Sequence, residues 1–117
     1  AAKGWIAGNP ATLYQAAIRA SMQQYGISPG AIDAYLAQPA VAYQGLQSIW
    51  VRRWVALFGG GAAEAWALVR RTGVPNLTPA VAGQQIPARL YYPDQERLYN
   101  PTNYKTVTLW TPMWWMK

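Results

Sequence analysis

Hydrophobic residues recur at helical spacing near the start of the chain. Between Asn9 and Gly26 they follow one another at steps of three and four residues: Leu13, Tyr14, Ala17, Ile18, Met22 and Tyr25. Asn9 can accept a hydrogen bond from a free backbone amide, and Pro10 suits the first helical position. The pattern predicts an amphipathic helix that begins at Pro10 and ends at Gly26.

The same start signal returns at Ser28 and Pro29, followed by a shorter apolar stripe of Ile32, Tyr35 and Leu36. This predicts a second helix, which must end before Pro39 because the residue preceding a proline disfavours helical geometry.

Two further helices are predicted around three consecutive glycines, Gly59 to Gly61. From about Gln44 to Phe58 a broad stripe contains Leu46, Ile49, Trp50, Arg53, Trp54 and Leu57. A fourth helix, from Ala62 to Arg71, ends at Thr72 and Gly73 and presents four alanines: Ala62, Ala63, Ala65 and Ala67. The short connection predicts an antiparallel hairpin, and the small side chains would let its axes approach closely.

The last third, from residue 74, has a different character, with six of the nine prolines. Four tyrosines lie among prolines and turn-forming residues in the stretch RLYYPDQERLYNPTNY, residues 89–104, where we expect no helix. Short extended pieces are predicted at residues 88–91 and 106–110. The fold class is therefore mainly α: residues 1–73 helical, residues 74–117 an irregular, aromatic-rich tail packed on them.

Composition and charge exclude several functions. The chain has 117 residues, 52% hydrophobic and only 12% charged, which suggests that something else covers part of its surface. Its net charge of +6 comes from scattered Lys and Arg residues, so we expect no nucleic-acid partner. The run from Ala34 to Val51 is too polar and too interrupted to cross a membrane.

The residue inventory gives little support for catalysis. Without Cys or His, thiolate metal sites and the usual nucleophile–base pairs are missing, and we expect neither an enzyme nor a cofactor. Asp94 and Glu96 could correspond to the paired acids of a glycoside hydrolase, but in a turn after Pro93 the aspartate more simply accepts from backbone amides.

Arg70 and Arg71 end the fourth predicted helix, where cations meet unpaired carbonyls favourably. Arg70 could also reach a carboxylate such as Glu96 and tie the tail to the hairpin. A phosphate site is the alternative, but no glycine-rich loop precedes a helix start with converging amides.

The aromatic residues divide into two groups. Those on the helical stripes are expected in the core: Tyr14, Tyr25, Trp50, Trp54 and Trp66. Tyr43, Tyr104 and Trp110 lie outside the stripes, where rings with polar neighbours can stack on sugar faces. They are the candidate ligand-binding residues.

Three stretches together resemble one known family. IWVRRWVALFGGGAAEAWALVRRTGVPNLTP, then IPARLYYPDQERLYNPTNY and a closing TPMWWMK are similar to the C-terminal portion of SusD/RagB-like lipoproteins of Bacteroidetes, and WIAGNPATLYQAAIRASMQQYGI matches as well. The resemblance covers nearly all 117 residues. The family's motif residues suggest a structural clasp formed by Arg70, Arg89, Tyr92, Glu96, Asn100 and Trp114.

This resemblance implies a non-enzymatic protein at the cell surface. Such outer-membrane lipoproteins take part in polysaccharide utilisation. They capture glycans or other nutrients and pass them to a SusC-like TonB-dependent transporter. Their fold has tetratricopeptide-like helical hairpins. In the alternative interpretation, this portion is a scaffold that contacts the transporter while ligand binds elsewhere.

The opening residues contain no initiator Met and no secretion signal. We therefore expect these 117 residues to be a piece of a longer parent chain. The remainder of that parent chain would be a further partner of this portion. Ala1 to Lys3 would be the end of a helix that stops at Gly4.

Overall fold

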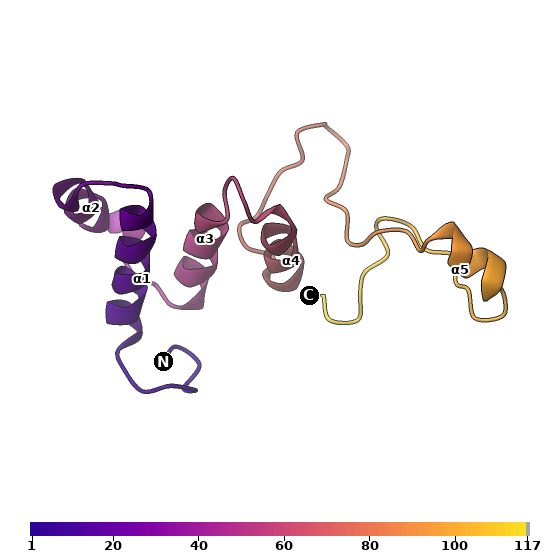
Figure 1. Ribbon diagram of the computed structural model, residues 1–117, viewed down its shortest axis with the longest axis horizontal. Helices are drawn as coiled ribbons and strands as arrows, with labels where there is room; N and C mark the ends of the chain where they lie inside the picture. The colour runs from indigo at the N-terminus through magenta and orange to yellow at the C-terminus, as the bar shows by residue number, and fades with distance from the viewer. Residues whose placement is uncertain (117) are drawn as a thin grey trace. The chain divides into compact units, whose positions relative to one another are not determined.

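The computed structural model describes residues 1–116. Within this range the chain forms five α-helices and one 3₁₀ helix but no strand, which confirms the mainly α prediction (Figure 1). The chain divides into two compact units, Ala1–Leu68 and Val69–Lys117. The boundary therefore falls inside the fourth helix.

The first two helices begin at the residues that the sequence indicates. Helix α1 spans Pro10–Gln24, and the side chain of Asn9 accepts a hydrogen bond from the Ala11 amide at 2.8 Å. Helix α2 spans Pro29–Leu36, with Ser28 accepting from Ala31 at 3.4 Å. Both caps satisfy an amide that the first helical turn leaves without a partner.

The core of the first unit forms where α1 meets its neighbours. Helix α1 has its most extensive helix contacts with α2 and with α3, which spans Leu46–Ala56. Tyr14, Ile18 and Val41 are buried together, the last in the 3₁₀ helix η1, Pro39–Val41. Ile32 of α2 is fully buried. Tyr25, expected in this core, is instead 67% exposed, because it follows the last turn of α1.

A single arginine of α3 connects several parts of this core. Arg52 donates from Nη2 to the Ala40 carbonyl at 2.6 Å and from Nε to the Tyr14 hydroxyl at 3.3 Å. Its guanidinium also lies over the Tyr35 ring of α2, 5.6 Å from the centroid. One side chain thus contacts α1, α2 and η1.

Helix α4 spans Ala62–Thr72 and follows α3 through the glycine-rich turn. Arg53 and Glu64 join the two helices by an ion pair of 3.3 Å. The predicted close approach through alanines is wrong at the start of α4, where Ala62 and Ala63 are exposed. The buried residue of this helix is the larger Leu68.

The second unit contains a helix that we did not expect. Helix α5, Asp94–Tyr99, follows Pro93 within the tyrosine-rich stretch. The prediction of no helix was wrong because Pro93 precedes a first turn with Asp94 and Glu96, a favourable arrangement beside free amides. The two pieces predicted as extended form no strand, but the amides of Ala88 and Arg89 donate to the Leu109 carbonyl at 2.7 and 3.2 Å.

The first residues also differ from expectation. Ala1 to Lys3 form a turn rather than the end of a helix, closed by a hydrogen bond from the Gly4 amide to the Ala1 carbonyl at 2.8 Å. Gly4 has a φ of 75°, a left-handed conformation that suits glycine.

Candidate functional site

An aromatic cluster of Arg89, Tyr92 and Tyr104 lies in the second unit, beside α5. The Tyr92 and Tyr104 rings meet edge to face, with centroids 6.3 Å apart and an interplanar angle of 65°. The Arg89 guanidinium lies over the Tyr92 ring, 4.5 Å from its centroid. Tyr92 is 43% exposed and Tyr104 is half-buried, so ring surface remains accessible. The cluster therefore combines two tyrosine rings that contact each other with the positive charge of Arg89.

A chain of amide contacts fixes the backbone that leads into Tyr104. Asn100 donates from its side chain to Glu96 at 2.6 Å and accepts from the Asn103 side chain at 2.9 Å. The Tyr104 amide donates to the Asn100 carbonyl at 3.0 Å. These bonds close the end of α5 and fix the backbone that leads to Tyr104. Sugar hydroxyls are suitable partners for such exposed amide groups.

The other two candidate ligand residues lie in different surroundings. Tyr43 belongs to the first unit, where its ring packs on the core and meets Tyr14 at 5.6 Å between centroids. Trp110 belongs to the second unit and is 42% exposed, in a turn that Thr108 and Thr111 close by mutual hydrogen bonds. Of the three, Tyr104 and Trp110 therefore share a unit, whereas Tyr43 contributes to packing in the other.

Arg70 ties the end of α4 to the tail through a backbone carbonyl and an aromatic ring. It donates to the Ala88 carbonyl at 2.8 Å, and its guanidinium lies over the Trp115 ring at 5.0 Å. Glu96 accepts from the side chain of Asn100, which follows the last residue of α5, and its pairing with Arg70 stays a prediction. Burial lowers the pKa of the Arg70 guanidinium, which still remains protonated at neutral pH.

The six residues of the expected clasp therefore do not act as one group. Glu96 and Asn100 bind each other, and Arg89 contacts Tyr92. Trp114 is 93% exposed, so its predicted place in a clasp is wrong for this structure. The adjacent Trp115 contacts Arg70 instead, and the sequence offers no signal that distinguishes the two tryptophans.

The remaining acid pair lies on one short helix. Asp94 and Glu96 lie in the first turn of α5, where residues two apart point to different sides of a helix. Oδ1 of Asp94 lies 4.0 Å from Nε of Arg97, and the Asp94 side chain is 91% exposed. Within residues 1–116, His, Cys, Asp and Glu form no group of three or more that could hold a metal ion.

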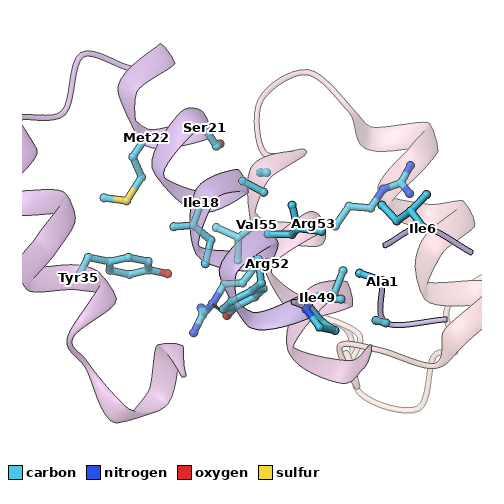
Figure 2. A pocket seen from close by; sticks show the side chains of 16 residues that line it. Ala1, Ile6, Ile18, Ser21, Met22, Tyr35, Ile49, Arg52, Arg53 and Val55 are labelled. Atoms are coloured by element: carbon cyan, nitrogen blue, oxygen red, sulfur yellow. Dashed lines mark hydrogen bonds between the residues drawn. The ribbon is translucent and has the colours of Figure 1, made fainter. Parts of the chain in front are cut away.

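An apolar groove opens in the first unit, on another part of the chain. It has a volume of about 690 Å³ and lies between α1, α3 and the first residues (Figure 2). Its lining includes Leu13 and Ala17 of α1, Ile49 and Val55 of α3, and Ile6. Sequence analysis assigned the helical stripe to the core and did not identify this opening.

Comparison with known protein families assigns the chain to one of them. Residues 1–93 match a SusD-like family described as starch-binding and associating with the outer membrane. The chain belongs to the SusD-like family. Among curated proteins none matches it. No helix within the described residues 1–116 is both long and apolar enough to cross a membrane.

A solved structure extends the family relationship to the fold. It is that of a chitin-binding protein, 31% identical over 98% of this chain, with a TM-score of 0.81. The match covers only 30% of that protein's own chain. The 117 residues thus correspond to less than a third of the chitin-binding protein.

Proposed function

We propose that this chain is the C-terminal portion of a SusD-like lipoprotein that binds glycans at the outer-membrane surface. The parent protein delivers them to a SusC-like TonB-dependent transporter and does not itself turn them over. The family match over residues 1–93 carries this proposal, and the similarity to a chitin-binding protein supports a polysaccharide ligand.

The ligand surface that we propose comprises Tyr104 and Trp110, with Tyr92 supporting Tyr104. A tyrosine ring offers its apolar face to the C–H face of a sugar while polar neighbours bind hydroxyls. Tyr92 holds the Tyr104 ring edge to face, which lowers the entropy that the ring would lose on binding. Asn103, the preceding residue, is exposed and carries an amide that can bind hydroxyls. Tyr43 is a third ligand candidate, through the part of its ring that the core leaves exposed.

Calorimetric titration of the parent protein with chito-oligosaccharides and malto-oligosaccharides tests this surface. Loss of one stacking ring removes about 1 kcal/mol, so Tyr104→Ala should weaken binding about fivefold. Trp110→Ala should act in the same direction. Tyr25→Ala is the matched control, because Tyr25 is an exposed tyrosine of the first unit. Unchanged affinity in both test variants, with normal folding, would contradict the proposed surface.

A scaffold role is the second candidate function. The packing of Tyr43 on Tyr14 and the 30% coverage of the relative favour it, because the remaining chain can hold the ligand. In that case the parent protein binds glycan with unchanged affinity after replacement of Tyr43, Tyr104 and Trp110 together, while transporter association depends on this portion. Co-purification of the parent protein with its transporter distinguishes the two roles.

A further inference from the structure

The apolar groove of the first unit leaves large hydrophobic side chains in contact with solvent. Leu13 is 44% exposed, Val55 47% and Ile6 64%. All three line the groove, together with Ile18, which belongs to the core (Figure 2). Removal of apolar surface from water contributes about 25 cal/mol per Å². A partner that covered these side chains would therefore bind with a substantial hydrophobic gain.

The two arginines that line the groove are already engaged. Arg52 binds Tyr14 and Ala40, and Arg53 pairs with Glu64. A sugar in the groove would leave hydroxyl groups facing apolar walls, and burying a polar group without a hydrogen bond is costly. The groove consequently suits an apolar occupant rather than the glycan of the proposed function.

The length of the solved relative indicates what this occupant is. Nearly the whole of the present chain superposes on 30% of the chitin-binding protein, so most of that longer chain lies outside the shared fold. Two walls of the groove are helices, α1 and α3. A third helix can place the apolar residues of one face, at i, i+3, i+4 and i+7, between two such neighbours.

We propose that the groove holds an amphipathic α-helix from the part of a longer parent chain that lies outside these 117 residues. The apolar face of this helix covers Leu13, Ala17 and Val55. The helix completes the hydrophobic core of the first unit, and its docking fixes this unit to the remainder of the parent protein.

Two neighbouring alanines of α1 provide a matched test in the parent protein. Ala16 and Ala17 are both exposed in the present chain, but only Ala17 lines the groove. The 117 residues contain no cysteine, so Ala16→Cys and Ala17→Cys each introduce one thiol into this portion. The rate of thiol alkylation is then measured by mass spectrometry of the peptide that contains the substitution.

The expected result is that the Ala17→Cys thiol reacts at least about tenfold more slowly than the Ala16→Cys thiol, because its labelling requires local opening. A photo-crosslinker at position 17 should join a peptide from outside residues 1–117. Equal labelling of the two thiols would overturn the proposal. Protection that depends on protein concentration, or on added transporter, would also overturn it, since the occupant would then be a second copy or the transporter.

A charge at the same positions gives an independent readout. Ala17→Glu should lower the stability of the parent protein, whereas Ala16→Glu should be tolerated, because only the first places a carboxylate against the apolar helix. Equal stability of the two variants would contradict the proposal. Glycan affinity is measured in parallel, so failure of the groove proposal is distinguishable from failure of the proposed function.

Discussion

The hydroxyl of Tyr14 donates to the backbone carbonyl of Val41 at 2.7 Å, a buried hydrogen bond between residues 27 positions apart. It links α1 to the short η1 helix, within the core of the first unit. The same hydroxyl accepts from Nε of Arg52.

Tyr14→Phe should destabilise the protein by about 1 to 3 kcal/mol, because it leaves the buried Val41 carbonyl without its donor. The free energy of unfolding in urea measures this loss. Tyr25→Phe serves as the control, since the ring of Tyr25 is exposed, and should change stability by less than about 0.5 kcal/mol. Equal effects of the two substitutions would show that the Tyr14 hydrogen bond contributes nothing.

The glycine turn between α3 and α4 provides a second prediction. A Cβ added at Gly61 would approach Leu57 Cβ to 2.9 Å and collide with the end of that side chain, whereas one added at Gly60 meets nothing within 4 Å. Gly61→Ala should therefore cost about 1 to 3 kcal/mol through overpacking. Gly60→Ala should be neutral or slightly stabilising, because neither residue requires a positive φ. Thermal unfolding of both variants checks this, and a reversed order would contradict it.

Arg70 should be more important than the adjacent Arg71 for order in the tail. Arg70→Lys removes the flat guanidinium that lies over Trp115 and shortens the reach to the Ala88 carbonyl. We expect faster proteolysis between residues 76 and 92 and a stability loss of about 1 kcal/mol. Arg71→Lys is the control, because Arg71 is exposed. Identical cleavage rates for the two variants would be inconsistent with the role assigned to Arg70.

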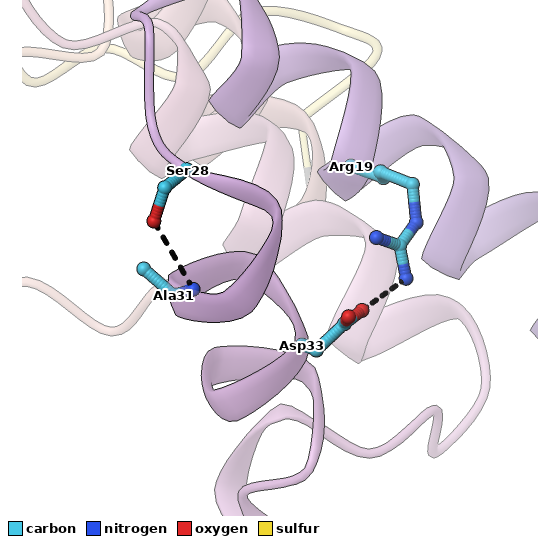
Figure 3. A network of polar contacts seen from close by, with 4 residues as sticks. All are labelled: Arg19, Ser28, Ala31 and Asp33. Carbon is cyan, nitrogen blue, oxygen red and sulfur yellow. Dashed lines mark hydrogen bonds and ion pairs between the residues drawn. The ribbon is translucent and has the colours of Figure 1, made fainter.

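The ion pair between Arg19 and Asp33 joins α1 to α2 at 2.7 Å on the surface (Figure 3). Both side chains are substantially exposed, so Asp33→Asn should cost less than about 1 kcal/mol. The loss should shrink further at about 1 M salt, where exposed charges are screened. Urea unfolding at low and high salt measures both effects. A loss above about 2 kcal/mol that is insensitive to salt would be too large for an exposed ion pair and would indicate a different role for Asp33.

The sequence predicted the helices whose signals are local. The Asn–Pro and Ser–Pro starts of α1 and α2 were readable because a cap and its amide lie within three residues of each other. Helix α5 was missed although its acidic first turn was visible. The tyrosines and prolines on either side of Asp94 and Glu96 are typical of an irregular segment and obscure this signal.

Contacts that depend on the path of the chain were less predictable. Nothing in the sequence indicates that Arg70 meets the Ala88 carbonyl, because this contact depends on how the tail folds back on the end of α4. The same holds for Tyr43, whose ring reaches Tyr14 from a position outside every helical stripe. The groove could not be predicted for a related reason. An apolar stripe in the sequence does not show how much of its surface a neighbouring element covers.

Arg52 has a consequence for how the first unit opens. Because one guanidinium contacts Ala40, Tyr14 and Tyr35, its release from any of them disturbs the others. Amide hydrogens of α1, α2 and η1 should consequently exchange with deuterium in a single concerted event, and not as three separately fraying pieces.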